Sequence, residues 1–162
     1  MLKINNASRP DVWVCRCGTA GEYEDLFISR KIIGIEAPHI DGYLDVDDYR
    51  ELKRKASKAD YNINPRDISR LYRFTHTIEV GDYVLVPSRS IRGRYHVGIV
   101  SGAIIFNHAE KLCYQRDVTW FANIEKSQFS EETKNSIGSL LTLFSPSLSK
   151  EEIDSIVDKG HE

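Results

Sequence analysis

The sequence has no long apolar run and few cysteines. No stretch approaches the roughly 20 apolar residues needed to span a bilayer, and the N-terminus MLKINNASRP lacks the apolar core of a signal peptide. We therefore expect a cytoplasmic protein. The three cysteines, Cys15, Cys17 and Cys113, are odd in number, and the first two form C-x-C rather than the C-x-x-C of a zinc knuckle. Their spacing favours buried side chains over a metal site.

The signatures of common enzyme classes are also absent. The chain contains no P-loop, G-x-G-x-x-G, G-x-S-x-G or H-E-x-x-H pattern. Five acidic residues lie between Glu36 and Asp48, but they fall in one predicted loop and not on strands beside a lysine, as a magnesium-dependent nuclease would need. We predict no catalytic residue, no metal site and no cofactor. A carboxylate site assembled from residues distant in sequence stays open as an alternative.

The composition is that of one ordinary globular domain. The chain has 162 residues, of which 41% are hydrophobic and 28% charged, and this length suits a single core. We predict a domain over residues 1–146. Residues 147–162 follow Ser145-Pro146 and are expected to form a linker or a docking tail with a short amphipathic helix at 148–158.

Period-two and helical patterns predict an α+β fold. Alternating or β-branched segments predict strands at 11–17, 31–35, 83–87, 95–100, 103–107, 112–121 and 140–144. Helical spacing predicts helices at 22–30, 47–58, from 64 onward with Pro65 at the first position, at 128–134 and at 148–158. Short strands with mixed connections indicate a small, partly closed β-barrel with flanking helices.

The net charge of −2 hides a strong regional asymmetry. Residues 50–94 hold 11 lysines and arginines against five acidic residues, whereas the segments on either side are each acidic overall. A basic block of this kind can form one positive face, and a positive face can bind phosphates. A solvated helix surface is the alternative interpretation for the RELKRKASK stretch.

Aromatic and basic residues alternate in two segments of this block, 70–76 and 89–96. Arginine binds phosphate through paired hydrogen bonds, and aromatic rings stack on unpaired bases. We predict these phosphate-binding residues: Arg16, Arg70, Arg73, Arg89, Arg92 and Arg94. Trp13 and Trp120 lie in predicted strands and line either the core or a base pocket. The loop framed by Gly18 and Gly21 is either a plain turn or an anion site.

Several motifs together resemble the N-terminal domain that precedes Mrr-type restriction nucleases, within the EVE branch of the PUA superfamily. The resemblance runs over residues 11–146, in this order: Trp13-Val-Cys-Arg16 with Gly18 and Gly21, Ile33-Gly-Ile35, Ile68 to Phe74, Glu79-Val-Gly-Asp82, Val86-Pro87, Tyr95 to Gly102, Val118-Thr-Trp-Phe121 and Asn135 to Phe144.

The resemblance implies a PUA/EVE-like β-barrel that reads modified or flipped bases in a restriction or defence system. It implies a base pocket near Trp13 and Ser88, with Arg16 at the rim. Glu36 stands where the family usually has a tryptophan, and its carboxylate could accept a hydrogen bond from the amino group of a base such as cytosine. The predicted base-pocket residues are Trp13, Glu36, Ser88 and Trp120.

The resulting hypothesis is a non-catalytic reader of DNA that targets a nuclease domain or subunit. Two alternatives stay open at this stage. The same superfamily includes RNA-binding modules, and a barrel mouth could instead hold a small nucleotide-like ligand or a protein partner. The acidic flanks and Glu36 favour the small ligand slightly.

Overall fold

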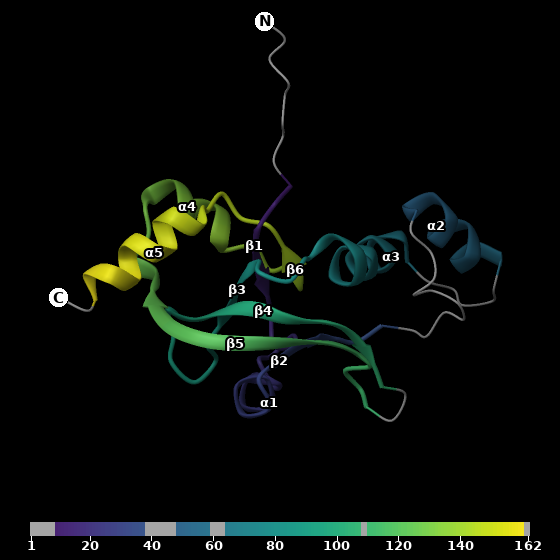
Figure 1. Ribbon diagram of the computed structural model, residues 1–162, viewed down its shortest axis with the longest axis horizontal. Coiled ribbons are helices and arrows are strands. Elements are labelled where there is room, and N and C mark those ends of the chain that lie inside the picture. Colours follow the sequence, from purple (N-terminus) through teal and green to yellow (C-terminus); the bar gives the residue numbers. More distant parts are fainter. Residues whose placement is uncertain (1–8, 38–47, 59–63, 108–109, 161–162) are drawn as a thin grey trace, which may run out of the picture.

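The computed structural model describes residues 9–37, 48–58, 64–107 and 110–160 as an α+β fold (Figure 1). Its centre is a six-stranded mixed sheet, and the described part of the chain also contains five α-helices. None of these helices combines the length and the apolar character that a bilayer crossing requires.

The sheet has the strand order β2-β5-β4-β3-β1-β6. The strands are β1 (Val12–Cys15), β2 (Ile32–Ile35), β3 (Tyr83–Pro87), β4 (Arg94–Phe106), β5 (Tyr114–Glu125) and β6 (Leu143–Phe144). β1 runs parallel to β3, and every other pairing is antiparallel. The strand predicted at 83–87 is confirmed at both ends.

β4 and β5 form one long antiparallel ribbon that bends twice. The pairing register shifts between Val97 and Gly98 and again between Val100 and Ile104. Bulges of this kind increase local twist and curvature. The interruption predicted at Ser101-Gly102 is therefore a bulge inside one strand. A Cβ atom on Gly98 would lie 2.4 Å from Val118, so only glycine fits this close approach between the two strands.

The predicted barrel is not closed. β2 and β6 are the two edges of the sheet, and each pairs with one neighbour only among the described strands. The segment 140–144 contributes only Leu143 and Phe144 to β6, so the strand predicted over the whole segment is too long. A two-residue strand offers too few backbone groups to continue the ladder around to β2.

The helices are α1 (Glu24–Arg30), α2 (Tyr49–Lys58), α3 (Pro65–Tyr72), α4 (Glu131–Ile137) and α5 (Lys150–Lys159). Pro65 occupies the first turn of α3, and the side chain of Asn64 caps it by accepting a hydrogen bond from the Arg66 amide at 2.9 Å. A π-helical turn, η2 (Arg73–Thr77), extends α3, and a short 3-10 turn, η3 (Lys126–Gln128), precedes α4.

A buried arginine on β5 fixes the end of this α3–η2 segment. The Arg116 guanidinium donates hydrogen bonds to the backbone carbonyls of Ile78 and Gly102, and burial lowers its pKa. Carbonyl groups at the end of a helix lack partners within it and carry partial negative charge. Arg116 therefore fastens the helical segment to the curved ribbon.

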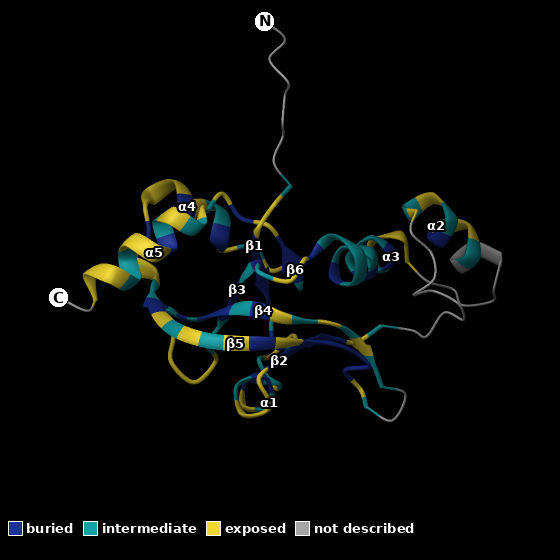
Figure 2. Ribbon diagram, viewed as in Figure 1, coloured by how far each residue is buried: buried dark blue, intermediate teal, exposed yellow. Residues whose placement is uncertain are grey.

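Buried residues run along the strands of the sheet (Figure 2), and their side chains form two separate clusters. Trp13 and Cys15 of β1 point into the larger cluster with Phe27 of α1 and Leu71 of α3. Val12 and its neighbours on the opposite face pack under α4 and α5. Successive side chains of a strand point to opposite faces, so β1 is buried on both.

Residues 147–160 belong to the same folded body. Ile153 of α5 is fully buried in the second cluster, and the Tyr83 hydroxyl donates a hydrogen bond to Asp154 at 2.7 Å. Lys150 donates to the Gly81 carbonyl at 2.8 Å. The short amphipathic helix predicted at 148–158 is observed as Lys150–Lys159.

Candidate functional site

A cavity of about 150 Å³ lies between the two edges of the curved sheet. Gly34, Ile35 and Glu36 line it from the β2 side, and Arg16 and Thr142 line it from the β1–β6 side. We call it the edge cavity. It occupies the position where a closed barrel would need its last pairing, so side chains replace backbone hydrogen bonds there.

A second hollow of about 230 Å³ adjoins the edge cavity. Its walls are the 17–21 loop that follows β1 and the first residues of the β3–β4 hairpin loop, including Ser88 and Arg89. We call it the loop hollow. Arg16, Gly18 and Thr19 line both spaces, so the two are neighbours that share these residues as a common wall.

Arg16 stands between these two spaces and is held at its backbone and its side chain. Its amide donates to the Thr142 carbonyl at 2.8 Å, and its guanidinium donates to the Leu140 carbonyl at 3.1 Å. This bond uses one of the five N–H donors of the guanidinium. The rest of the group is available to a bound anion at the rim that the resemblance implied.

Arg70 reaches the edge cavity from α3. Its guanidinium forms an ion pair with Asp67 at 3.2 Å, but its Nε–H is buried and has no hydrogen-bond partner among the described residues. An unsatisfied buried donor is costly, of the order of 1–3 kcal/mol. Arg70 thus borders the cavity, while its Nε–H stays enclosed in the protein.

Glu36 and Tyr23 bridge the edge cavity. The Tyr23 hydroxyl donates a short hydrogen bond to the Glu36 carboxylate, and this bond raises the pKa of Tyr23 to about 12. The contact orients one carboxylate oxygen of Glu36, while the second oxygen can still accept. A carboxylate in this position can recognise an amino group.

Glu22 covers the glycine loop. Its carboxylate accepts a hydrogen bond from the Ala20 amide at 2.9 Å and packs where a Cβ of Gly18 would stand, 2.4 Å away. Hydrogen bonds from the backbone of Glu22 and Ala20 lower its pKa. The loop therefore binds an anionic group, and that group is the carboxylate of Glu22, the residue directly after the loop.

Glu24 at the start of α1 fixes the hairpin loop that carries Ser88. Its carboxylate accepts from the Ser90 amide at 3.0 Å and lies 2.8 Å from Nε2 of His96. Burial acts to raise the pKa of Glu24, but hydrogen bonds from Ser88, His96 and Ser90 outweigh it and hold the pKa at about 2. Glu24 lies between the serines and the histidine, which is not the order of a nucleophile–base–acid triad.

The chain also matches one family model. The match is to a domain of unknown function, DUF8426, over residues 16–145. The chain belongs to this family. A comparison with curated proteins gave no match. The matched segment of the DUF8426 domain contains both spaces of the site and ends just after β6.

Five predicted site residues of the DUF8426 domain come together in the structure. Arg16, Glu36 and Arg70 line the edge cavity, and Arg16, Ser88 and Arg89 line the loop hollow. They come from four separate segments of the chain, and the fold alone brings them together.

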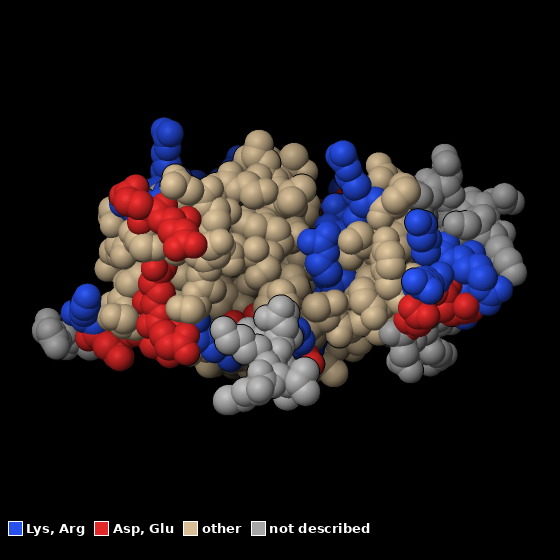
Figure 3. Space-filling model, turned by 90° about the horizontal axis from the view of Figure 1, so that it is seen from above, with Lys and Arg blue, Asp and Glu red and all other residues tan. Residues whose placement is uncertain are grey.

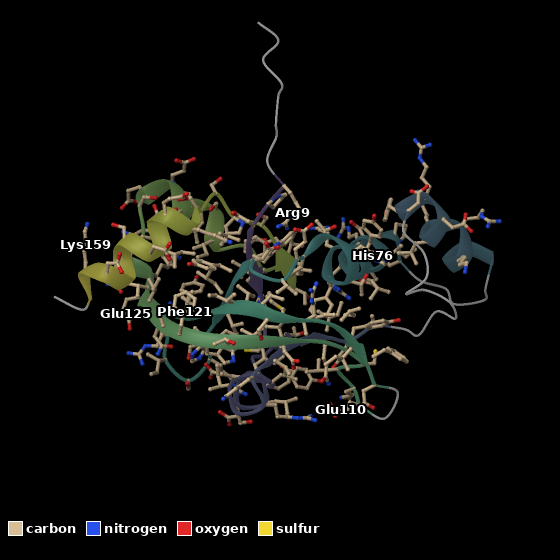
Figure 4. The ribbon with its side chains drawn as sticks, viewed as in Figure 1. Arg9, His76, Glu110, Phe121, Glu125 and Lys159 are labelled. Atoms are coloured by element: carbon tan, nitrogen blue, oxygen red, sulfur yellow. The ribbon has the colours of Figure 1, made fainter. Side chains whose placement is uncertain are left out.

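Trp13 does not line a pocket. Only 1% of its surface is exposed, and its indole donates to the Asp82 carboxylate at 3.0 Å inside the core. Asp82 also accepts two hydrogen bonds from Arg9, at 2.6 and 2.7 Å, at the start of β1 (Figure 4). The Gly81-Asp82 motif thus ties β1 to the turn before β3, and Gly81 supplies the positive φ of 99° which that turn requires.

The other predicted residues lie elsewhere. Trp120 is half-buried against α1, where its indole donates to the Phe27 carbonyl at 3.0 Å, and Arg73 donates to Ser69 on its own helical segment. Arg94 forms an ion pair with Glu125 at 3.0 Å. Figure 4 shows Glu125 at one end of the β4–β5 ribbon and Glu110 at the other end. Arg92 is exposed on the hairpin loop and lines neither space. The predicted aromatic wall reduces to one ring, Tyr23.

The two cysteines after Trp13 are inert. Burial raises the pKa of Cys15 to about 12 and that of Cys17 to about 11, so both stay as thiols at neutral pH. Among residues 9–37, 48–58, 64–107 and 110–160, no group of three histidine, cysteine or acidic side chains is placed to hold a metal ion.

Several residues that line the edge cavity were not predicted as site residues, among them Thr19, Glu22, Tyr23 and Thr142. Tyr23 falls in the helix predicted at 22–30, where its helical spacing gives no signal of a site. Thr142 falls inside the strand predicted at 140–144, whereas β6 begins only after it, at Leu143. The Gly18-to-Gly21 spacing gave the only sequence signal for the loop that positions Thr19 and Glu22.

Proposed function

We propose that this DUF8426 domain binds nucleic acid and holds one unpaired base in the edge cavity, with DNA the preferred partner. In this proposal Arg16 and Arg89 contact the phosphates beside the loop hollow. Glu36 and Arg70 bind the edge of the inserted base. The domain has no catalytic role in the proposal and serves as a targeting module for a nuclease.

The single observation that carries the proposal is the junction of the two spaces at Arg16, Gly18 and Thr19. A nucleotide-binding site needs a cation for the phosphate and a recess for the base, close enough together to contact the same nucleotide. Arginines at the rim and a carboxylate inside meet these two needs.

The dimensions and the charge distribution support the proposal. A cavity of about 150 Å³ is the size that admits benzene, so one six-membered ring is a reasonable occupant. Figure 3 shows acidic side chains gathered over α4 and α5, and basic side chains over the α3 and α2 end. This separation would orient the domain on a polyanion.

The resemblance to PUA/EVE-like domains of restriction systems agrees with this use of the site. The six-stranded curved sheet with helices on both faces is compatible with that fold. Extruding a base costs a few kcal/mol, which contacts in such a pocket can offset. Because the resemblance implies recognition of modified bases, the proposal includes recognition of a modified base.

Binding to labelled DNA duplexes tests the proposal. Duplexes without modification, with 5-methylcytosine and with N6-methyladenine are compared by fluorescence anisotropy over a range of salt, with single-stranded RNA as a competitor. We expect binding that weakens steeply with salt and favours one duplex. Absence of salt-dependent binding to every nucleic acid would rule the proposal out.

A second candidate function is the binding of a small nucleotide-like molecule. Two carboxylates, Glu22 and Glu36, line the edge cavity and would repel a phosphate chain laid across it. A thermal-shift screen with nucleosides and cyclic nucleotides addresses this alternative. A rise in Tm with a nucleoside, without any duplex binding, would favour it.

A further inference from the structure

Two adjacent leucines, which precede the cavity-lining residue Thr142 in the chain, face solvent. Leu140 is 83% exposed and Leu141 is 58% exposed, the first being the most exposed large apolar side chain among the described residues. The pattern Leu140-Leu-Thr-Leu-Phe144 predicts a strand that would use such residues, but β6 begins only at Leu143. Their exposure therefore needs another explanation than sheet packing.

The loop that carries the leucines is held firmly in place. The Leu140 carbonyl accepts from the Arg16 guanidinium, and the Thr142 carbonyl accepts from the Arg16 amide. The Leu141 amide donates to the Ser139 hydroxyl at 3.3 Å. Both neighbours of Leu141 are thus tied to the residue that joins the edge cavity and the loop hollow.

The position of this loop relates the leucines to the cavity. Thr142 lines the edge cavity, so Leu141 is the residue next to the cavity wall along the chain. Arg16, which anchors the loop, lines both spaces of the site. A polymer whose unit enters the cavity beside Arg16 would bring its adjoining units close to the loop that Arg16 holds.

We infer that Leu140 and Leu141 act as an apolar wedge that enters the base stack of duplex DNA when one base is extruded into the edge cavity. This inference rests on the proposed function and identifies the form of its ligand as duplex rather than single strand. Proteins that distort DNA insert leucine, isoleucine or phenylalanine between base steps, which compensates for the lost stacking. The Arg16 guanidinium, which donates to the Leu140 carbonyl at 3.1 Å, places a positive charge beside the pair and favours a polyanion over an apolar protein surface as the occupant.

The wedge has a property that separates it from an ordinary contact. It fills the gap that the departing base leaves, so it contributes when a paired base must be extruded. It contributes little when the partner strand already leaves that base unpaired. The cost of unpairing is lowest for mismatched or single-stranded bases.

The test compares wild-type protein with the double variant Leu140→Ser/Leu141→Ser. Two labelled probes are used: the duplex that binds the wild type best, and the same duplex with an abasic site opposite the recognised base. We expect roughly tenfold weaker binding of the variant to the paired duplex, and less than about twofold for the abasic one. A 2-aminopurine beside the recognised base reports unstacking as a rise in fluorescence, which the variant should lose.

Val80→Ser is the matched control. Val80 is 60% exposed on the turn before β3 and lines neither space of the site. It should leave both affinities unchanged, and Tm should be unchanged in all variants because the replaced side chains are exposed. Equal loss on both probes, or no loss on either, overturns the wedge and leaves the proposed function standing. If the wild type binds no duplex at all, the proposed function and the wedge fall together.

Discussion

At the scale of single residues, the hydrogen bond between Tyr23 and Glu36 defines the inner wall of the edge cavity. It joins Tyr23, the N-cap residue of α1, to Glu36, which follows β2 at the edge of the sheet. The state of this pair determines how many acceptor sites Glu36 can offer to a bound group.

Glu36→Gln should lower the pKa of Tyr23 from about 12 toward its ordinary value of 10, because the carboxylate that raises it is gone. Nuclear magnetic resonance of labelled tyrosine rings over an alkaline titration measures this. Tyr83 serves as an internal control, since burial and Asp154 raise its pKa to about 12 without any contact to Glu36. An unchanged Tyr23 titration would mean that the bond does not form in solution.

The arginines are distinguished by their partners. Arg89 borders the loop hollow, whereas Arg94 is paired with Glu125 away from it. We expect Arg89→Ala to weaken DNA binding regardless of sequence and to lower the salt slope by about 1, as the loss of one phosphate contact does. Arg94→Ala is the control and should leave the slope unchanged. Equal effects of the two variants would contradict the position of the site.

At the scale of elements, the site depends on how loops are held and not on the strands alone. The glycine loop after β1 closes over Glu22, and the β3–β4 hairpin loop is fixed by Glu24 of α1. Glu22 and Glu24 lie two residues apart at the start of α1, so this short segment contacts both loops.

Glu24 makes this arrangement sensitive to acid. Its folded-state pKa of about 2 lies below the ordinary 4.5, so its contribution to stability is complete above pH 4.5 and is lost as the pH falls toward 2. The free energy of unfolding should fall by up to about 3 kcal/mol over that range.

Urea denaturation at several pH values measures this loss. Glu24→Gln should flatten the profile between pH 4.5 and 2, and Glu131→Gln, which changes an exposed side chain, should not. A wild-type profile already flat in this range would contradict the buried network.

At the scale of the whole molecule, two clusters on opposite faces of one sheet make the domain interdependent. α5 lies beyond the segment matched by the family model, yet its residue Ile153 is fully buried in the second cluster. The C-terminal helix therefore contributes to the stability of the core that supports the site.

Ile153→Ala should lower the free energy of unfolding by about 3 kcal/mol, as expected for a cavity in a packed core. Thermal and urea denaturation measure it, and Ser155→Ala on the exposed side of α5 is the control. A loss below about 0.5 kcal/mol would show that α5 detaches readily and behaves as a tail.

The sequence alone determined most of the local structure. Period-two and helical patterns located the strand at 83–87, the helix begun by Pro65 and the glycine loop, because these depend on neighbouring residues. It also indicated Arg16, Glu36, Arg70, Ser88 and Arg89 as site residues. The bulge at Ser101 was visible only as a break in pattern.

Tertiary structure decided the rest, because it depends on residues far apart in the chain. Trp13 and Trp120 have the same local context, and only the fold shows that Asp82 and Phe27 satisfy their indoles in packed surroundings. Likewise, an arginine's neighbours in sequence do not reveal that Glu125 engages Arg94 while Arg89 borders a hollow. Local propensity sets the elements, whereas the order and curvature of the sheet, which leave β2 and β6 as its two edges, set where charges and cavities meet.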